Sequence, residues 1–196
     1  KCLVVSKNYS YGFHGKGNTK TLSKSGRDDG FDVIVRKLVE IKGSVVSSSK
    51  IRELIKNGEI ALANEMLGRA YTISGTVVSG ANRGGCLGFP TANIEFSDAD
   101  LIVPAKGVYA AKVLISDIEH MGMANIGYNP TFGDVDKKRL EINIFDFIDD
   151  IYGKEITVRL MHYIRGERKF TSPAELYEQI QKDKDIISAY FSEKEK

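Results

Sequence analysis

The chain has 196 residues, of which 42% are hydrophobic and 28% charged, a composition typical of a globular protein. No apolar run approaches the roughly 18 residues of a membrane-spanning helix, and no charged-then-apolar signal peptide opens the chain, so the sequence predicts no membrane partner. Cys2 and Cys86 form no C-x-x-C pair and the three histidines are scattered, which argues against a zinc site and favours the cytoplasm.

The charge is unevenly distributed along the chain. Residues 1–66 contain 12 Lys/Arg and 7 Asp/Glu, a balance of +5, whereas residues 67–196 contain 16 and 19, a balance of −3. A basic first third suits a nucleotide or a nucleic acid, although a solvated basic surface has the same composition. Because no basic patch with interleaved aromatic residues occurs, the sequence does not favour a nucleic-acid partner. It indicates no oligomeric state.

The first third has the pattern of an α/β module. Two short runs rich in apolar and β-branched residues, 3–5 and 31–35, predict strands. Serines at 47–49 can cap a short helix over residues 50–56, and a second short helix is expected over residues 60–67. Gly58 and Gly68 follow these two helices, where a helix C-terminus favours glycine.

The rest of the chain consists mainly of strand candidates separated by turn residues. They cover residues 73–79, 108–115, 121–126, 140–147 and 156–164. In one of them, Leu140, Ile142 and Ile144 alternate with Glu141 and Asn143, the period-two pattern of a strand with one buried face. The sequence therefore predicts an α+β chain in which an antiparallel barrel or sandwich follows the α/β module.

One strong helix is predicted near the end of the chain. Residues 172–175, Ser-Pro-Ala-Glu, form a capping box with proline at the first helical position. Leu176, Ile180, Ile187 and Phe191 then lie roughly along one face. We expect this face to pack on the barrel.

The stretch over residues 80–93, G-A-N-R-G-G-C-L-G-F-P-T-A-N, carries the strongest chemical signal. Its glycines let the backbone approach a ligand closely, and successive exposed N–H groups in such a loop can bind an anion. Two oxygen-bearing side chains near its end point to the same side of an extended chain and, with phosphate oxygens and waters, would suit Mg²⁺. The candidate ATP- and phosphate-binding residues are Gly80, Arg83, Gly84, Gly85, Gly88, Thr91 and Asn93, the last two also as metal ligands.

The same stretch could instead be an inert, solvent-exposed turn, because glycine-rich loops are common. It is not a Walker A loop, since no Gly-Lys-Ser/Thr follows the glycines. The H-R-D and D-F-G motifs of protein kinases do not occur in the chain either. Phosphate chemistry at this loop would therefore use another architecture.

Six motifs, in order, resemble those of the riboflavin kinase family. They are the glycine-rich stretch at 80–93, P-x-x-G-V-Y at 104–109, N-I-G-x-x-P-T-F-G at 125–133, L-E-x-H-x at 140–144 with Asn143 in place of the usual His, I-Y-G at 151–153, and R-x-E-x-K-F at 165–170. The resemblance runs from about residue 67 to the last helix. It implies a six-stranded antiparallel β-barrel with a terminal helix over residues 67–196.

The resemblance also implies roles for individual residues. Thr91 and Asn93 would hold Mg²⁺ and the ATP phosphates, and Glu141 would be the base that deprotonates the ribityl 5′-hydroxyl of riboflavin, giving FMN. Phosphoryl transfer needs positioning, charge neutralisation and one proton acceptor, which fits these residue types. Periodicity alone leaves Glu141 either solvent-exposed or facing a polar site. Since Asn also forms hydrogen bonds, Asn143 is expected to tune activity without abolishing it.

Two further segments are implied to lie near the substrates. The loop at 125–133 could close over nucleotide and flavin as a lid, or could be an ordinary hairpin connection. The segment at 165–170 could contact substrate, or could only form salt bridges across the barrel. The candidate flavin or lid residues are Asn125, Gly127, Pro130, Thr131, Arg165 and Arg168.

In the first third, S-S-S-K-I-R at 47–52 resembles a motif of the nucleotidyltransferase module that precedes the kinase in bacterial bifunctional riboflavin kinase/FAD synthetases. The residues are Ser47, Ser48, Ser49 and Arg52. Hydroxyls, N–H groups at a helix start and an arginine together suit a phosphate, although a serine-capped helix is the simpler interpretation.

The catalytic H-x-G-H motif of that module does not occur, because His14 is followed by Gly-Lys. The chain also begins at Lys1. We therefore expect residues 1–66 to be an incomplete FMN adenylyltransferase module, with little or no adenylylation by this chain alone and a bifunctional parent enzyme.

Two alternatives stay open: a non-catalytic flavin-binding regulator on the same barrel, and an adenylyltransferase fragment with an inert kinase-like tail. The presence of Thr91, Asn93 and Glu141 favours the kinase.

Overall fold

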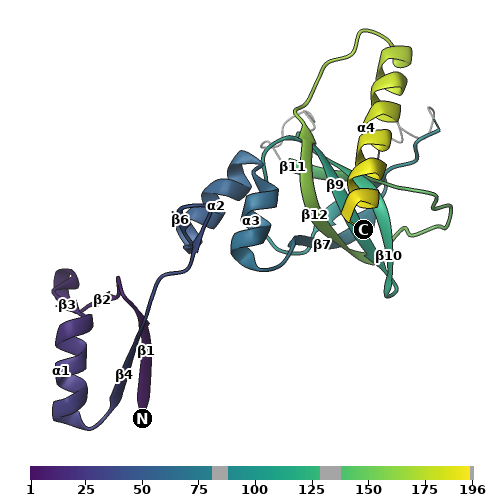
Figure 1. Cartoon of the computed structure of the whole chain (residues 1–196). Coiled ribbons are helices and arrows are strands. Elements are labelled where there is room, and N and C mark those ends of the chain that lie inside the picture. Colours follow the sequence, from purple (N-terminus) through teal and green to yellow (C-terminus); the bar gives the residue numbers. More distant parts are fainter. Residues whose placement is uncertain (81–87, 129–137, 195–196) are drawn as a thin grey trace. The chain divides into compact units, whose positions relative to one another are not determined.

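A computed structural model describes residues 1–80, 88–128 and 138–194, and contacts divide the chain into two compact units, Lys1–Lys50 and Ile51–Lys196 (Figure 1). Within these described ranges, no helix combines the length and apolar character needed to cross a membrane. Helix α2 (Ser48–Asn57) begins in one unit and continues in the other, so this division does not test the predicted boundary between residues 66 and 67.

The first unit contains a two-stranded parallel sheet and one longer helix. The sheet pairs β1 (Cys2–Ser6) with β4 (Asp32–Arg36), which confirms both predicted strands. The other elements are β2 (Ser10–Tyr11), η1 (Phe13–Gly15), β3 (Gly17–Asn18), α1 (Thr19–Asp29), β5 (Glu40–Ile41) and β6 (Ser44–Val45). The unit is therefore α/β, as expected.

Helix α1 has no counterpart among the predicted elements. Its residues are mostly polar and only Leu22 and Gly26 are buried, so the apolar period of a helix is nearly absent. The available signal was a capping box, in which Asn18 Oδ1 accepts from the Thr21 amide at 3.2 Å and Thr21 Oγ1 accepts from the Asn18 amide at 2.9 Å. A Cβ at Gly26 would lie 2.6 Å from the Phe31 carbonyl oxygen, so this close helix–strand packing needs glycine.

The two short predicted helices are present. In α2 the predicted serine cap is confirmed, because Ser47 Oγ accepts from the Lys50 amide at 3.2 Å. Helix α3 (Ile60–Leu67) ends at Gly68, whose φ of 69° is the left-handed conformation expected there. This helix packs against the barrel, where Asn64 donates from Nδ2 to the Leu160 carbonyl at 2.8 Å.

The second unit is built on a closed six-stranded barrel with antiparallel pairing throughout, which confirms the predicted architecture. Its strands are β7 (Tyr71–Val78), β8 (Ala92–Phe96), β9 (Gly107–Ile115), β10 (Ile118–Tyr128), β11 (Lys138–Ile144) and β12 (Glu155–Arg165), in the spatial order β10-β11-β8-β7-β12-β9. Strand β8 corresponds to the end of the glycine-rich stretch, where the sequence pattern showed only extended chain.

The barrel interior is a packed apolar core. Leu140 and Ile142 of β11 are fully buried, as are Ile126 and Leu160 on other strands. Glu141 and Asn143 alternate with the two β11 residues and therefore lie on the outer face of the barrel. The predicted alternation of this strand thus separates its core positions from its polar positions.

Helix α4 (Pro173–Lys194) covers part of the outer face, as predicted. Ile187 and Phe191 are buried there in a cluster with Val108, Met123 and other barrel residues. At its start, the predicted capping box is formed only in part. Ser172 Oγ accepts from the Glu175 amide at 3.2 Å, but the Glu175 carboxylate accepts from the amide and hydroxyl of Thr171.

Candidate functional site

The strand register aligns one residue from each of four neighbouring strands in a row around one end of the barrel. Asn93 of β8 lies opposite Glu141 of β11, Glu141 lies opposite Asn125 of β10, and Asn125 lies opposite Val108 of β9. The row continues to Arg165 of β12, which pairs with Val108. Directly paired residues point to the same face of a sheet. These side chains therefore share the outer face on which Glu141 lies.

A cavity of about 560 Å³ opens on this outer face, bounded by the barrel wall, the segment after β12 and α4. Its polar lining residues are Thr91, Asn125, Glu141, Asn143, Arg165, Glu167, Arg168, Lys169 and Asp183, and its apolar lining residues are Val108, Met123, Phe170, Leu176 and Ile180. Five motifs that are distant in the sequence thus contribute to one cavity. The predicted residues that line it together are Thr91, Asn125, Glu141, Arg165 and Arg168, whereas Asn93 is not among its described lining residues.

A second cavity of about 400 Å³ lies beside it, at one end of the barrel. It is lined mainly by apolar residues, including Ile142 and Ile144 from the barrel interior, and by residues 147–152. Thr91 lines both cavities. A ligand in one cavity can therefore approach a ligand in the other at Thr91.

Two contacts fix the backbone around Thr91 and Asn93. Asn143 is 6% exposed and donates from Nδ2 to the Pro90 carbonyl at 2.7 Å, which ties β11 to the residue before Thr91. A Cβ at Gly80 would lie only 1.8 Å from Asn93 Nδ2, so the Asn93 amide rests directly against the glycine backbone. Gly80 is therefore needed for the position of Asn93, a reason that the sequence alone did not provide.

Some of the other predicted residues in the two loops lie within the described part of the chain and others do not. Gly88 has a φ of 80°, a left-handed conformation that favours glycine. Arg83, Gly84 and Gly85 of the glycine-rich stretch lie outside the described residues, as do Pro130 and Thr131 of the predicted lid.

The end of β10 contacts the segment after β12. A Cβ at Gly127 would lie 2.6 Å from Glu167 Oε1, so the Glu167 carboxylate packs closely against this glycine. The first residues of the predicted lid and the 165–170 segment therefore meet at the cavity, although nothing in their sequence spacing indicates this contact.

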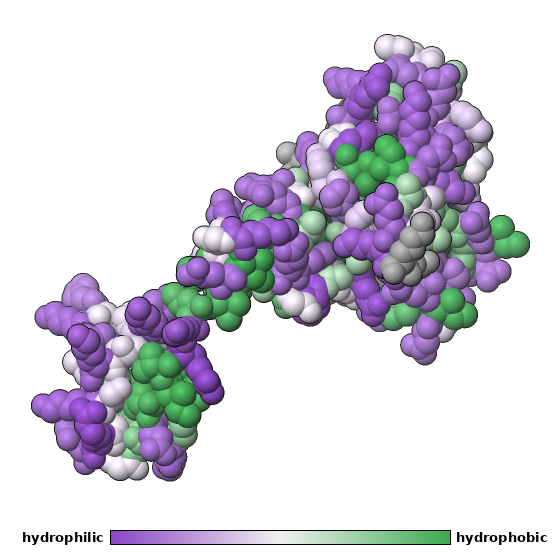
Figure 2. All heavy atoms as spheres, viewed as in Figure 1, coloured by the Kyte–Doolittle hydropathy of each residue, from purple (hydrophilic) through white to green (hydrophobic). Residues whose placement is uncertain are grey.

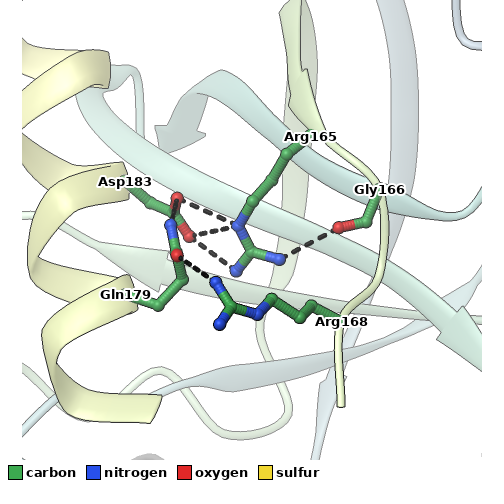
Figure 3. A network of polar contacts seen from close by, with 5 residues as sticks. All are labelled: Arg165, Gly166, Arg168, Gln179 and Asp183. Atoms are coloured by element: carbon green, nitrogen blue, oxygen red, sulfur yellow. Dashed lines mark hydrogen bonds and ion pairs between the residues drawn. The ribbon is translucent and has the colours of Figure 1, made fainter. Parts of the chain in front are cut away.

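A polar network joins the 165–170 segment to α4 (Figure 3). Arg165 donates from Nε to both oxygens of Asp183, at 3.0 and 2.9 Å, and from Nη2 to Oδ2 at 2.7 Å. Gln179 donates to Asp183 Oδ1 at 2.9 Å, and Arg168 donates to Gln179 Oε1 at 3.3 Å. Arg168 also forms an ion pair with Glu175, so both predicted arginines form salt bridges and also line the cavity.

Glu175, at the start of α4, adds a further carboxylate beside Arg168. Hydrogen bonds from the backbone and side chain of Thr171, together with the neighbouring Arg168, lower the pKa of Glu175. Asp183 was not among the predicted residues. The available signal was its position three residues after Ile180 and four before Ile187, which places an acidic residue on the apolar face of α4.

The predicted phosphate site at residues 47–52 lies at the start of α2. Ser47 caps α2, as described above, and Ser48 and Ser49 form its first turn, with Arg52 one turn further on. All four are exposed. A serine-capped helix accounts for these contacts.

The chain is similar to bacterial bifunctional enzymes. It is 41% identical over 191 residues to the bifunctional riboflavin kinase/FMN adenylyltransferase of Bacillus subtilis, covering 96% of this chain and 60% of that protein. It is 39% identical to the protein of the same name from Listeria monocytogenes, covering 98% and 61%. The chain thus spans about three fifths of the length of these curated relatives.

A solved structure and a protein family also match. The structure, described as a macrolide-efflux protein from Streptococcus pneumoniae, has a TM-score of 0.84 and 34% identity, covering 93% of this chain and 58% of that one. Residues 67–191, which include the barrel and most of α4, match the flavokinase family, described as riboflavin kinase. Since this match covers more than half of the chain and all the residues of both cavities, the chain belongs to the riboflavin kinase family.

Proposed function

We propose that this chain transfers the γ-phosphoryl group of ATP to the 5′-hydroxyl of riboflavin, giving FMN and ADP. The observation that carries the proposal is the placement of Glu141. It lines the larger cavity, lies opposite Asn93 on the neighbouring strand, and shares that cavity with Thr91. A carboxylate is thereby available beside two neutral oxygen donors, which is the set that phosphoryl transfer to a hydroxyl requires.

In the proposed reaction, the Glu141 carboxylate accepts the proton of the riboflavin 5′-hydroxyl. The hydroxyl oxygen forms a bond to the γ-phosphorus, and the bond between the γ-phosphorus and the bridging β,γ-oxygen breaks, releasing ADP. Thr91 and Asn93 orient the phosphates at the meeting point of the two cavities. Most of the rate enhancement in such reactions comes from positioning and from stabilising charge.

We assign riboflavin to the larger cavity and the nucleotide to the smaller one. The larger cavity contains Glu141 and combines apolar side chains, such as Phe170, with polar ones, which suits an aromatic ring that carries a polyol chain. The smaller cavity is mainly apolar and suits a nucleobase. Thr91 lines both, which supports the transfer of a phosphoryl group between their ligands.

The residues present fit a hard divalent cation such as Mg²⁺. Among the described residues, no group of three or more His, Cys, Asp or Glu could hold a metal by itself. Thr91 and Asn93 offer oxygen donors, and a cation there would complete its coordination with phosphate oxygens and waters. When bound, it would neutralise phosphate charge.

We also propose that residues 1–66 belong to an FMN adenylyltransferase module of a bifunctional, cytoplasmic enzyme. The support is the name of both relatives and the length of the matches to them, together with the motif at residues 47–52. A non-catalytic flavin-binding regulator is the alternative. It would have no use for a carboxylate beside Thr91 and Asn93, so the kinase is favoured.

The test is FMN formation from riboflavin and Mg²⁺-ATP, analysed by chromatography that also resolves FAD. Glu141→Gln should reduce kcat at least about hundredfold and leave riboflavin binding nearly unchanged, because the amide keeps the shape but cannot accept the proton. The matched control is Glu95→Gln, an exposed carboxylate on the adjacent strand β8, which should behave as the unaltered chain.

Three outcomes separate the candidates. FMN without FAD supports an active kinase beside an incomplete adenylyltransferase. An unchanged kcat in Glu141→Gln would remove Glu141 from the role of base. Absence of both products from a folded chain that binds riboflavin would favour the regulator.

A further inference from the structure

Asp183 is a buried carboxylate that the proposed reaction does not use. The residue has no exposed surface, yet it lies on α4 at the wall of the larger cavity. Its two oxygens accept hydrogen bonds from Arg165 and from Gln179, as Figure 3 shows. The carboxylate is thus fully engaged by protein groups.

A contribution to folding stability does not by itself explain why Arg165 and Asp183 form a buried ion pair. Removing two charges from water costs about as much as their attraction returns, and apolar side chains of similar size often stabilise a core as well or better. The neighbouring positions of α4 on the same face, Ile180 and Ile187, are in fact apolar. A buried carboxylate at position 183 therefore points to a requirement on the position of its partner.

The partner, Arg165, also lines the larger cavity. It is the β12 member of the row that contains Asn93, Glu141 and Asn125. Its Nη1 donates to the Gly166 carbonyl at 3.0 Å, where the chain leaves the strand. Its guanidinium carbon lies 5.9 Å from the centre of the Phe170 ring, within the range of a cation–π contact.

The planar guanidinium binds the carboxylate through two of its nitrogens, which fixes its orientation as well as its position. Since Arg165 contacts both the start of the 165–170 segment and the Phe170 ring near its end, fixing Arg165 also fixes this wall of the cavity. None of the described residues that line the smaller cavity belongs to α4 or to this segment.

We propose that Asp183 is a positioning residue for the flavin substrate. It holds Arg165, and through it the 165–170 segment, in the conformation that receives riboflavin before the substrate arrives. The inference rests on the proposed function, because it takes the larger cavity as the riboflavin site. When this wall is already ordered, riboflavin binding does not have to supply the free energy needed to order it. Loss of Asp183 therefore weakens riboflavin binding more than it slows the chemical step.

The test is Asp183→Asn, which keeps the side-chain shape and removes the charge. KM for riboflavin should rise about tenfold, the effect of losing one charge-assisted contact, with KM for ATP unchanged and kcat within about threefold. Riboflavin binding without ATP, followed by quenching of flavin fluorescence, should weaken by the same factor. The matched control is Asp185→Asn, because Asp185 is exposed on the same helix and accepts from Gln181 at 3.2 Å, as Asp183 does from Gln179.

A second experiment tests whether Asp183 acts through Arg165. In an Arg165→Met background, the further change Asp183→Asn should add little to the rise in KM for riboflavin, since the contact is already lost. If Asp183→Asn does not fold, Arg165→Lys replaces it, because lysine keeps the charge but loses the two-nitrogen contact. The same selective rise in KM for riboflavin is expected.

Two results would overturn the inference. One is a KM for riboflavin within twofold of the unaltered chain in folded Asp183→Asn or Arg165→Lys. The other is an equal rise in both KM values with a lower melting temperature, which indicates a purely structural role. If these occur while Glu141→Gln still abolishes turnover, the proposed kinase stands and only the role of Asp183 fails. If Glu141→Gln keeps full turnover, the proposed function fails first.

Discussion

The two compact units differ in how their strands end at the protein surface. In the unit Ile51–Lys196 the sheet closes on itself, so its six strands leave no open edge and enclose side chains with almost no exposed area. In the unit Lys1–Lys50 the sheet has two parallel strands, and Leu3, Val4, Ile34 and Val35 are between 41% and 64% exposed. Figure 2 shows this apolar surface gathered over the first unit.

The barrel covers its own apolar side chains, whereas the sheet of the first unit leaves apolar side chains exposed to solvent or to a partner. Parallel sheets are normally covered on both faces, and two strands alone bury little surface. The barrel has both a closed core and a helix on its outer face, and the unit Ile51–Lys196 contains every described residue that lines the two cavities. We therefore expect the proposed chemistry and most of the folding free energy to reside in the barrel, and the comparison can be tested by matched changes in the two units.

The largest expected effect is on stability. Leu160→Ala removes a fully buried side chain of the barrel and should lower the free energy of unfolding by about 2–5 kcal/mol, because a cavity remains where the side chain was. Val35→Ala, at a position that is 41% exposed in the first unit, should change it by less than about 1 kcal/mol. Urea unfolding followed by circular dichroism measures both. Equal losses would contradict the contrast between the units.

A smaller effect, on catalytic efficiency with ATP, is expected when the buried hydrogen bond of Asn143 is removed. Asn143→Leu removes the hydrogen bond to the Pro90 carbonyl and should lower kcat/KM for ATP about tenfold, because the backbone before Thr91 is no longer held. Asn143→His, whose ring can also donate, should retain most of the activity.

The matched change in the first unit is Asn18→Ala. It removes an exposed helix cap, so it should destabilise α1 without altering kinase kinetics. A loss of kcat/KM in this variant as large as in Asn143→Leu would show that the site depends on the first unit.

The smallest effect concerns alkaline pH. Burial raises the pKa of Tyr109, whose hydroxyl donates to the Ala105 carbonyl inside the barrel. Because the folded-state pKa lies above the unfolded one, this group's stabilisation is complete below pH about 10 and is lost as the pH rises toward the folded value, by at most about 1.4 kcal/mol per pH unit. Tyr109→Phe should flatten this decline in urea unfolding, whereas Tyr9→Phe, at an exposed position of the first unit, should not.

Much of the barrel could be predicted from the sequence, because turn residues separate its strands and β11 alternates between apolar and polar residues. The alternation around Glu141 correctly separates core from outer-face positions, and the sequence patterns predict five of the six strands. The sixth, β8, is implied only by the resemblance to riboflavin kinases. Sequence could not reveal that Asn93, Glu141 and Asn125 stand in one row, since register depends on how the barrel closes. The roles of these residues stay predictions.

The features that the sequence did not predict also have physical explanations. Helix α1 is held by its cap and by close packing at Gly26, so its sequence lacks the apolar period on which helix prediction depends. Asp183 is paired with a residue 18 positions earlier, and no local pattern links the two. The contact between Gly80 and Asn93 likewise joins the two ends of the glycine-rich stretch, and only the folded backbone brings them together.

The outward position of the site offers a practical route for protein engineering. On β10 and β11, Met123, Asn125, Glu141 and Asn143 line the larger cavity, while the intervening Ala124 and Ile142 are fully buried. Successive residues of these strands therefore have different roles: one faces the ligand cavity, and the next packs in the barrel core. A combinatorial library that varies Asn125 and Lys169, which line the cavity and are not buried, while keeping Glu141 and the buried neighbours would explore new flavin analogues with little risk to the scaffold.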